Sequence, residues 1–452
     1  MIAGAGPTGL TVARELQRRG VPFRIVEKST EPFTGSRGKG LQPRTQELLD
    51  DLGLIDRFRA AGSDYPELLI HLPGGQIMRQ RMDELHEPTP AVPYPNVLMV
   101  PQWRTAALLA EGIPVELGVG VAAVTQDETD VHVTLDSGER VTCRYLVGAD
   151  GGKSTVRRAL GVGFEGETHE SEQLLIADVR LTGLDRDNWH IWPGEGRSFR
   201  LGLCPLPGTD DFQLTAPPTD LPIEKLVASV DPSITVTHVG WTSQFRANIR
   251  MVSQFRVGNV FLAGDAAHVH SPAGGQGLNT GIQDAYNLAW KLATGDEALL
   301  DTYEAERLPV AAGVLGISTR LHRRAVAGDD DAMRRDDPAL RQLQLSYRGG
   351  PLARDHRDAP GAVRAGDRAP DAPCGGGRVF DLLRGPHATV LAFDWAGELP
   401  AGLPVHHISD PGAREIYDVR VPTLFLVRPD NYIGCATTDV TDLDAYRTMI
   451  GN

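Results

Sequence analysis

A glycine-rich turn at the start of the chain has the residue types of a nucleotide-binding turn. The G-x-G-x-x-G pattern consists of Gly4, Ala5, Gly6, Pro7, Thr8 and Gly9. A helix is expected over 10–19, so backbone N–H groups can approach a pyrophosphate at the positive end of a helix dipole. Glu27 ends the next expected strand, 21–27, where a carboxylate can bind a ribose diol. This acid favours an adenine dinucleotide over a turn whose glycines are only structural.

The first strand of this unit is very short, because only Met1, Ile2 and Ala3 precede Gly4. Either the strand is unusually short or a few residues are missing. The helix after Gln102 also ends early, at 109–112, where a shortened loop or an omitted segment is the explanation.

A second glycine-rich segment follows an expected buried strand, 259–263. Gly264 and Asp265 stand at the carboxyl end of that strand, where open α/β sheets bind ligands. Residues 272–281 contain four glycines and lead into an expected helix, 282–293. A helix N-terminus suits the negative charge of a reduced isoalloxazine, and Asp265 suits a ribityl or ribose hydroxyl. The two segments together predict the two ends of one FAD site.

A third segment, 145–158, also runs from an apolar strand into a helix, through the turn Asp150-Gly151 and on to Arg157. Taken alone, this segment favours an ordinary strand-to-helix loop. It gains weight only from its place between the two glycine-rich segments.

These segments resemble those of the single-component (class A) flavoprotein aromatic hydroxylases, which have the p-hydroxybenzoate hydroxylase-like fold. Residues 272–279 are most similar to the subgroup that hydroxylates aromatic polyketides of the anthracycline, angucycline and tetracycline type. Further matches at 36–45, 100–104 and 303–309 extend the resemblance over nearly the whole chain.

The resemblance implies roles for individual residues. The first turn would seat the FAD pyrophosphate, and Arg37 and Gln102 would contact the pyrophosphate or ribityl chain. Asp150 would serve flavin binding and NAD(P)H use together. The full expected cofactor-binding set is Gly4, Gly6, Pro7, Thr8, Gly9, Glu27, Lys28, Arg37, Gln102, Asp150, Gly151, Arg157, Gly264, Asp265, Pro272, Gly275, Gly277, Leu278 and Asn279.

The implied reaction needs no nucleophilic side chain. NADPH or NADH would reduce the flavin during a transient visit, dioxygen would add at flavin C4a, and the hydroperoxide would pass oxygen to an electron-rich ring. The flavin-loop residues Pro272, Gly275 and Gln276 would lie beside the reacting edge. Arg44 resembles a family arginine near the flavin, with a surface ion pair as the alternative. The protein itself must exclude solvent and position the ring.

A small aromatic, polycyclic substrate would be held by a sheet of short strands expected between residues 171 and 246. We expect one face of this sheet to cover the substrate. The candidate residues are Trp192, Phe199, Leu201, Trp241 and Phe245, each of which is at least as typical of a plain core. Arg246 is a weaker candidate, because an exposed salt bridge explains it better.

No metal site is predicted. His268 and His270 stand near Asp265 without a set of cysteine or carboxylate ligands, and the resemblance implies that His268 is structural. His406 and His407 are adjacent, so they would face opposite ways on a strand. The four cysteines form no C-x-x-C motif.

Composition agrees with a globular enzyme. The formal net charge of −14 argues against nucleic acid and anionic membranes as partners. A signal peptide and an apolar run long enough to span a bilayer are not visible, so a cytoplasmic monomer or homodimer is expected.

The expected fold class is α/β plus α+β. A discontinuous Rossmann-like FAD-binding domain would comprise residues 1–63, 96–163 and 255–327, and a β-sheet substrate domain would comprise 64–95 and 164–254. A linker, 328–378, would lead to a thioredoxin-like C-terminal domain, 379–452, with Pro422 placed as the cis-proline of that fold. This last domain lacks paired cysteines, so a structural or oligomerisation role is expected.

Alternative functions remain open from the sequence. Within the same fold they are a Baeyer–Villiger oxygenation and the inactivation of an antibiotic of the rifamycin type. From another class they are a flavin-binding dehydrogenase or sensor.

Overall fold

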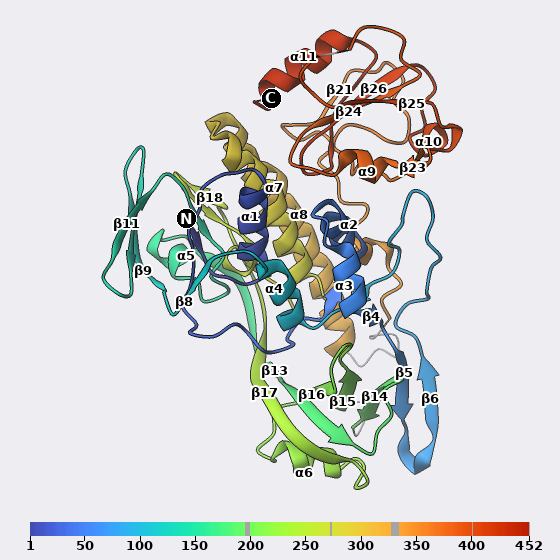
Figure 1. The fold of residues 1–452 in the computed structure, drawn as a ribbon. Coiled ribbons are helices and arrows are strands. Elements are labelled where there is room, and N and C mark those ends of the chain that lie inside the picture. Colours follow the sequence, from blue (N-terminus) through green and yellow to red (C-terminus); the bar gives the residue numbers. More distant parts are fainter. Residues whose placement is uncertain (195–198, 272–273, 327–333, 400, 452) are drawn as a thin grey trace.

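The computed structural model describes residues 1–194, 199–271, 274–326, 334–399 and 401–451, with the side chains of 168–172, 245–247 and 322–326 left undescribed. Three units follow one another along the long axis of the molecule in Figure 1. A helical and β-stranded unit lies in the middle, a large sheet lies at one end, and the C-terminal unit lies at the other.

The central unit is built on a six-stranded sheet whose strands come from three separate stretches of chain. In spatial order they are β18 (Arg256–Val257), β19 (Val260–Leu262), β12 (Leu146–Gly148), β1 (Ile2–Ala3), β2 (Ile25–Glu27) and β8 (Val115–Leu117). All neighbours are parallel except β18 and β19. The inner strands are buried and apolar, as parallel strands covered on both faces must be.

Helices cover this sheet and bring the glycine-rich segments to its carboxyl edge. They are α1 (Pro7–Arg18), α2 (Pro43–Asp51), α3 (Ile55–Ala61), α4 (Gln102–Ala110), α5 (Thr155–Ala159), α7 (Gly277–Thr294) and α8 (Glu297–Val326). A separate three-stranded sheet comprises β9 (Val121–Gln126), β10 (Val131–Leu135) and β11 (Arg140–Cys143). The short strands β3 (Gly40–Leu41) and β4 (Ser63–Asp64) both pair with β7 (Leu98–Met99).

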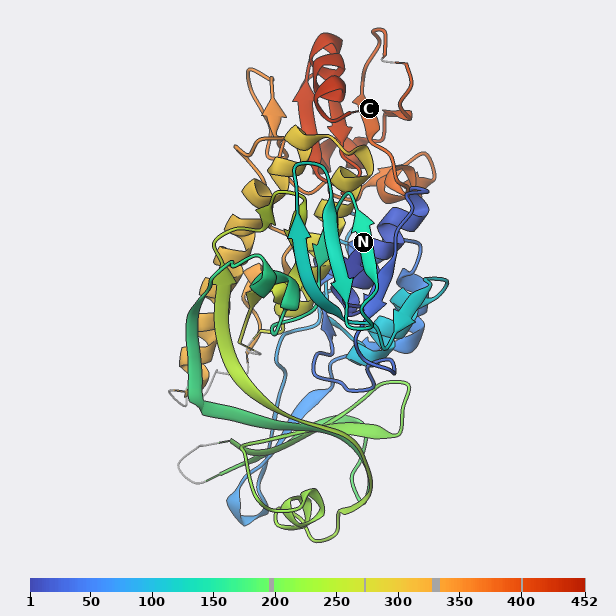
Figure 2. The ribbon, with the colours of Figure 1, turned by 90° about the vertical axis from the view of Figure 1, so that its left-hand side faces the viewer.

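Two long antiparallel strands, β13 (Phe164–Thr182) and β17 (Thr235–Val252), run from the central unit into the large sheet (Figure 2). The sheet has eight strands. Its other members are β20 (His268–Val269), β16 (Asp211–Ala216), β15 (Phe199–Pro205), β14 (Asn188–Pro193), β5 (Glu67–His71) and β6 (Ile77–Gln80). The helix α6 (Ile223–Ala228) packs on the face turned away from the central unit.

The C-terminal unit contains a mixed five-stranded sheet with a core of its own. The strands are β21 (Arg354–Asp355), β27 (Ile433–Thr437), β26 (Thr423–Val427), β24 (Thr389–Phe393) and β25 (Val405–Ile408). The helices are α9 (Val379–Leu383), α10 (Pro411–Ile416) and α11 (Val440–Met449), and a short hairpin joins β22 (Pro373–Cys374) to β23 (Gly377–Arg378). The peptide bond before Pro422 is trans, so the cis-proline expectation is wrong. The thioredoxin-like assignment stays a prediction.

The stretch expected to be a linker is packed over much of its described length. The 3-10 helix η4 (Pro338–Arg341) is followed by Gln342 and Tyr347, which are both buried, and β21 joins the C-terminal sheet. Across the described ranges, no helix is long and apolar enough to cross a membrane.

Candidate active site

A cavity of about 980 Å³ opens along the first glycine-rich turn and reaches the large sheet. Its lining includes eight expected cofactor residues, namely Gly4, Gly6, Pro7, Glu27, Lys28, Gln102, Asp150 and Gly151. At its far end it meets Asp178, Asp211 and Trp241, which belong to the large sheet. The expected adenosine end and the sheet expected to hold substrate therefore border one space.

Each of the three glycines in the turn is a glycine for its own physical reason. A Cβ on Gly9 would stand 2.0 Å from the carbonyl oxygen of Gly4, and one on Gly4 would stand 2.4 Å from that of Ala149. Both glycines therefore allow close packing between α1, β1 and the end of β12. No described atom lies within 4 Å of the corresponding point at Gly6. The open space at Gly6, beside the N-terminus of α1, suits a pyrophosphate.

Two polar side chains of the cavity shape its walls. The Glu27 carboxylate accepts hydrogen bonds from the backbone N–H groups of Ala5 (2.9 Å) and Ser29 (3.0 Å), which keeps it at the end of β2. Gln102 accepts a hydrogen bond from the N–H of Gly38 (2.9 Å) and so anchors the loop that carries Arg37. Arg37 itself is exposed.

The side chains of Asp150, which also lines the cavity, and of Arg157 both bind backbone groups. The Asp150 carboxylate accepts hydrogen bonds from the N–H groups of Thr155 (2.7 Å) and Val156 (3.2 Å), so it caps α5. Arg157 is buried and donates to the carbonyl oxygens of Ala266 (2.9 Å) and Gly152 (2.8 Å). These contacts tie the Asp150 turn to the second glycine-rich segment.

The two glycine-rich segments touch through Thr8. Its hydroxyl oxygen lies 2.5 Å from where a Cβ would stand on Gly264 and on Gly281, so only glycine allows this contact. Asp265 follows in the 3-10 helix η3 (Gly264–Ala266), and its carboxylate has no hydrogen-bond partner among the described residues. Desolvation by the surrounding protein atoms raises the pKa of Asp265, although the charges of His268 and Arg37 oppose this shift. An accessible, unpartnered carboxylate suits a cofactor hydroxyl.

The start of α7 is held from several directions. Asn279 is fully buried; it accepts a hydrogen bond from the N–H of Gln42 (2.8 Å) and donates to the carbonyl oxygens of Gly40 and Gly275 (both 2.9 Å). Gly275 has a φ of +62°, which favours glycine. Gly277 and Leu278 are half-buried beside it. Pro272 lies outside the described residues.

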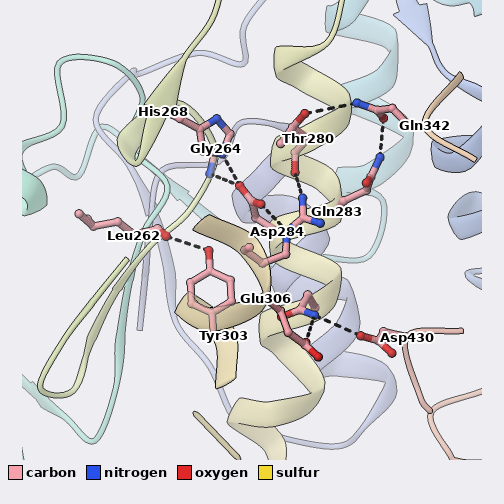
Figure 3. Close-up of polar contacts among 12 residues, drawn as sticks. Leu262, Gly264, His268, Thr280, Gln283, Asp284, Tyr303, Glu306, Gln342 and Asp430 are labelled. Carbon is pink, nitrogen blue, oxygen red and sulfur yellow. Dashed lines mark hydrogen bonds and ion pairs between the residues drawn. The ribbon is translucent and has the colours of Figure 1, made fainter. Parts of the chain in front are cut away.

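Behind this turn lies a buried polar network (Figure 3). The Asp284 carboxylate contacts His268 Nε2 (2.6 Å), Arg307 Nε (2.8 Å) and the N–H of Gly264 (3.1 Å). Burial alone would raise the pKa of Asp284, but the charges of His268 and Arg307 lower it to about 2. His268 also contacts His270 (2.9 Å). The histidines therefore brace the segment after Gly264, and no metal-ligand group occurs in the described part of the chain.

The residues at both ends fit FAD. The first turn offers uncrowded backbone at Gly6, the Glu27 carboxylate lines the same cavity, and Asp265 has no hydrogen-bond partner among the described residues. These features are far apart in sequence and belong to one sheet edge.

The large sheet divides the expected substrate residues between its faces. Trp192 and Leu201 lie in the core under α6, so side-chain alternation places them away from the cavity. Trp241 pairs with Asp178 across β17 and β13 and lines the cavity. A bulge after Trp192 turns the ring of Phe199 toward Gly202, on the same face as Asp178. The side chains of Phe245 and Arg246 lie outside the described residues.

Arg44 forms an ion pair, but this pair is buried and not at the surface as the alternative expected. Its guanidinium is 1% exposed, pairs with Glu47 (2.8 Å) and donates to the carbonyl oxygen of Asp430 in the C-terminal unit (3.2 Å). It is a buried ion pair at the boundary between two units.

Sequence reasoning missed the polar residues that support the site. Thr280, Gln283, Asp284, Asn287 and Lys291 are all buried and follow helical spacing along α7. A polar stripe of this spacing in an otherwise apolar helix is the signal that could have identified them. No comparable signal marks Asp178 or Gln342.

Comparison with known proteins shows the family of this chain. Residues 1–318 match the model of a family described as FAD binding domain. A flavin-dependent monooxygenase of Mycobacteroides abscessus is 47% identical over 97% of this chain and 96% of its own length. A rifampicin monooxygenase of Rhodococcus hoagii is 32% identical, with coverage of 98% and 96%. The solved complex of aklavinone-11 hydroxylase with FAD and aklavinone has a TM-score of 0.82 and is 25% identical in sequence. The match covers 99% of this chain and 98% of that chain.

Fold and site together define an FAD-dependent aromatic monooxygenase. The chain belongs to the FAD-binding family of flavoprotein hydroxylases. This membership removes the flavin-binding dehydrogenase and the sensor from the alternatives.

Proposed function

We propose that this enzyme hydroxylates a polycyclic aromatic polyketide, with FAD bound, NADPH or NADH as a transient reductant and dioxygen as co-substrate. The observation that carries the proposal is the similarity to the aklavinone-11 hydroxylase complex over nearly the full length of both chains. Supporting this, the cofactor cavity reaches a sheet face that carries the aromatic ring of Trp241.

The chain's own residues would bind and orient the cofactor. The pyrophosphate would lie at Gly6, the adenosine ribose at Glu27, and a ribityl hydroxyl at Asp265. FAD, once bound and reduced, would supply the activation of dioxygen and the transfer of one oxygen atom to the ring. The backbone N–H groups at the start of α7 would stabilise negative charge on the ring system.

Substrate would be held between the flavin and the sheet face of Asp178. The protein's remaining task is to exclude water and keep the aromatic carbon within reach of the flavin. We further propose that the parallel sheet of the central unit is Rossmann-like; the order of its five parallel strands supports this assignment.

The experiment is a turnover assay on the purified holoenzyme with tricyclic and tetracyclic phenols and a single-ring phenol as control. We expect the polycyclic phenols to stimulate NADPH or NADH oxidation and their products to gain one oxygen atom from labelled dioxygen. Stimulation by the single-ring phenol alone would contradict the polyketide assignment.

A second candidate, oxidation of a rifamycin-type antibiotic, is favoured by the full-length similarity to a rifampicin monooxygenase. The same assay with rifampicin separates the two candidates. A product that gains one oxygen, accompanied by loss of antibacterial activity, would support the second.

A further inference from the structure

Residues of the segment after α8 contact Gln276, which directly precedes α7. Gln342 is 1% exposed and has a φ of +60°, a conformation that a glutamine adopts rarely. Its side-chain N–H group donates to Gln276 Oε1 (2.7 Å). Its Oε1 accepts from Gln283 Nε2 (2.6 Å), a contact that can be followed in Figure 3. One side chain therefore bridges the residue that precedes α7 and the second turn of that helix.

This contact helps to fix the side-chain conformation of Gln276. Its own side-chain N–H group donates to the carbonyl oxygens of Gly274 (2.8 Å) and Leu340 (3.2 Å), so both ends of its amide are engaged. Gln276 is 1% exposed, and its backbone leads directly into the Gly277–Asn279 turn. Two of its partners, Leu340 and Gln342, belong to the stretch that the sequence indicated as a linker.

The same stretch also supports the other flavin-facing segment. The Tyr347 hydroxyl accepts a hydrogen bond from Arg307 (2.9 Å), and Arg307 pairs with Asp284, which accepts from the N–H of Gly264. Two independent routes thus lead from residues 338–347 to the two backbone segments expected to contact FAD.

We propose that Gln342 is a positioning residue for the flavin: it fixes Gln276 and thereby aims the backbone N–H groups at the start of α7. The inference rests on the FAD site of the proposed function but not on the substrate class. Those N–H groups stabilise the reduced, anionic ring more than the oxidised ring, because only the former carries the charge. Loosening them should therefore disfavour reduced FAD selectively.

The test compares Q342M with Q344M, both measured on holoenzyme without any aromatic substrate. Methionine keeps the length and removes the hydrogen bonds; Gln344 is exposed, so it is the matched control. We expect Q342M to bind reduced FAD about tenfold more weakly relative to oxidised FAD, which lowers the two-electron midpoint potential by about 30 mV. Q344M should keep the wild-type potential.

A second variant, Q342E, keeps the acceptor for Gln283 and loses the donor to Gln276, so its potential should fall in the same direction. A lower melting temperature with an unchanged potential in both Gln342 variants would show a merely structural role and overturn the proposal. Wild-type protein that binds no FAD would instead refute the FAD site itself, so the two failures are distinguishable.

Discussion

At the scale of single residues, Asp178 has surroundings that are unusual for an aspartate. It is 6% exposed, one of its oxygens has no hydrogen-bond partner, and it borders the cofactor cavity. Burial raises the pKa of Asp178 to about 6; the nearby charge of Asp211 adds to this shift, and Ser36 and Lys39 oppose it. Its proton therefore leaves much closer to neutral pH than that of an exposed aspartate.

This gives a prediction for the FAD-free protein. Because the folded state holds the Asp178 proton more tightly than the unfolded state, stability should fall as pH rises from about 4 to about 6. Asp178→Asn should remove this component and stabilise the protein at pH 7 by at most about 3 kcal/mol, with little gain at pH 4. Urea unfolding at both pH values measures this change in the free energy of unfolding. The exposed Asp210→Asn is the control, and an equal gain at both pH values would contradict the prediction.

At the scale of elements, the conformation of the first turn depends on the close packing of α1 against the sheet. Gly9 and Gly4 allow that approach, whereas Gly6 leaves room at the helix N-terminus. We therefore expect packing and ligand binding to depend on different glycines of one motif.

Two variants should separate these roles. Gly9→Ala places a Cβ against the Gly4 carbonyl and should lower the free energy of unfolding of the FAD-free protein by about 2 kcal/mol or more. Gly6→Ala meets no protein atom, so it should leave that stability within about 0.5 kcal/mol but weaken FAD binding at least tenfold. Thermal unfolding and flavin-fluorescence titration measure the two effects. Unaltered FAD affinity in Gly6→Ala would show that the pyrophosphate lies elsewhere.

At the scale of the whole molecule, the C-terminal unit is joined to the central unit by buried charges. Arg428 pairs with Glu306 of α8 and with Asp430, both at 2.5 Å, and Lys291 of α7 pairs with the same Glu306 (2.8 Å). All four side chains are at most 1% exposed on the side-chain scale. Burial lowers the pKa of Lys291 to about 8 although Glu306 opposes the shift.

Removing one of these buried charges should therefore lower the stability of the protein substantially. Arg428→Met leaves Glu306 and Asp430 undercompensated in a buried site, and we expect a loss of about 3–5 kcal/mol in the free energy of unfolding. The exposed pair of Arg79 and Glu67 supplies the control, since Arg79→Met should cost under about 1 kcal/mol. Urea unfolding gives both values, and faster proteolysis after residue 334 would report loosening of the C-terminal unit. Equal losses in the two variants would refute this account.

Much of the local structure was predictable from the sequence. The helix after the first turn, the strand ending at Glu27 and the strand before Gly264 are confirmed, because apolar periodicity and glycine turns are local signals. Strict alternation along β15 would place Phe199 and Leu201 on one face, but the bulge after Trp192 puts Phe199 on the opposite face. Alternation also could not show which face meets the cavity. That depended on where α6 packs, and so Trp192 and Leu201 lie on the far side.

The residues alone indicated the family, the two glycine-rich segments expected at the ends of the cofactor site, and the strands that lead to them. The tertiary structure decided which polar side chains support those ends, because contacts such as Gln342 with Gln276 join positions 66 residues apart. It also decided that residues of the supposed linker contact Gln276 at the start of α7. Periodicity indicates which residues are buried. The hydrogen-bond partners of a buried polar side chain, however, depend on which distant segments the fold packs together.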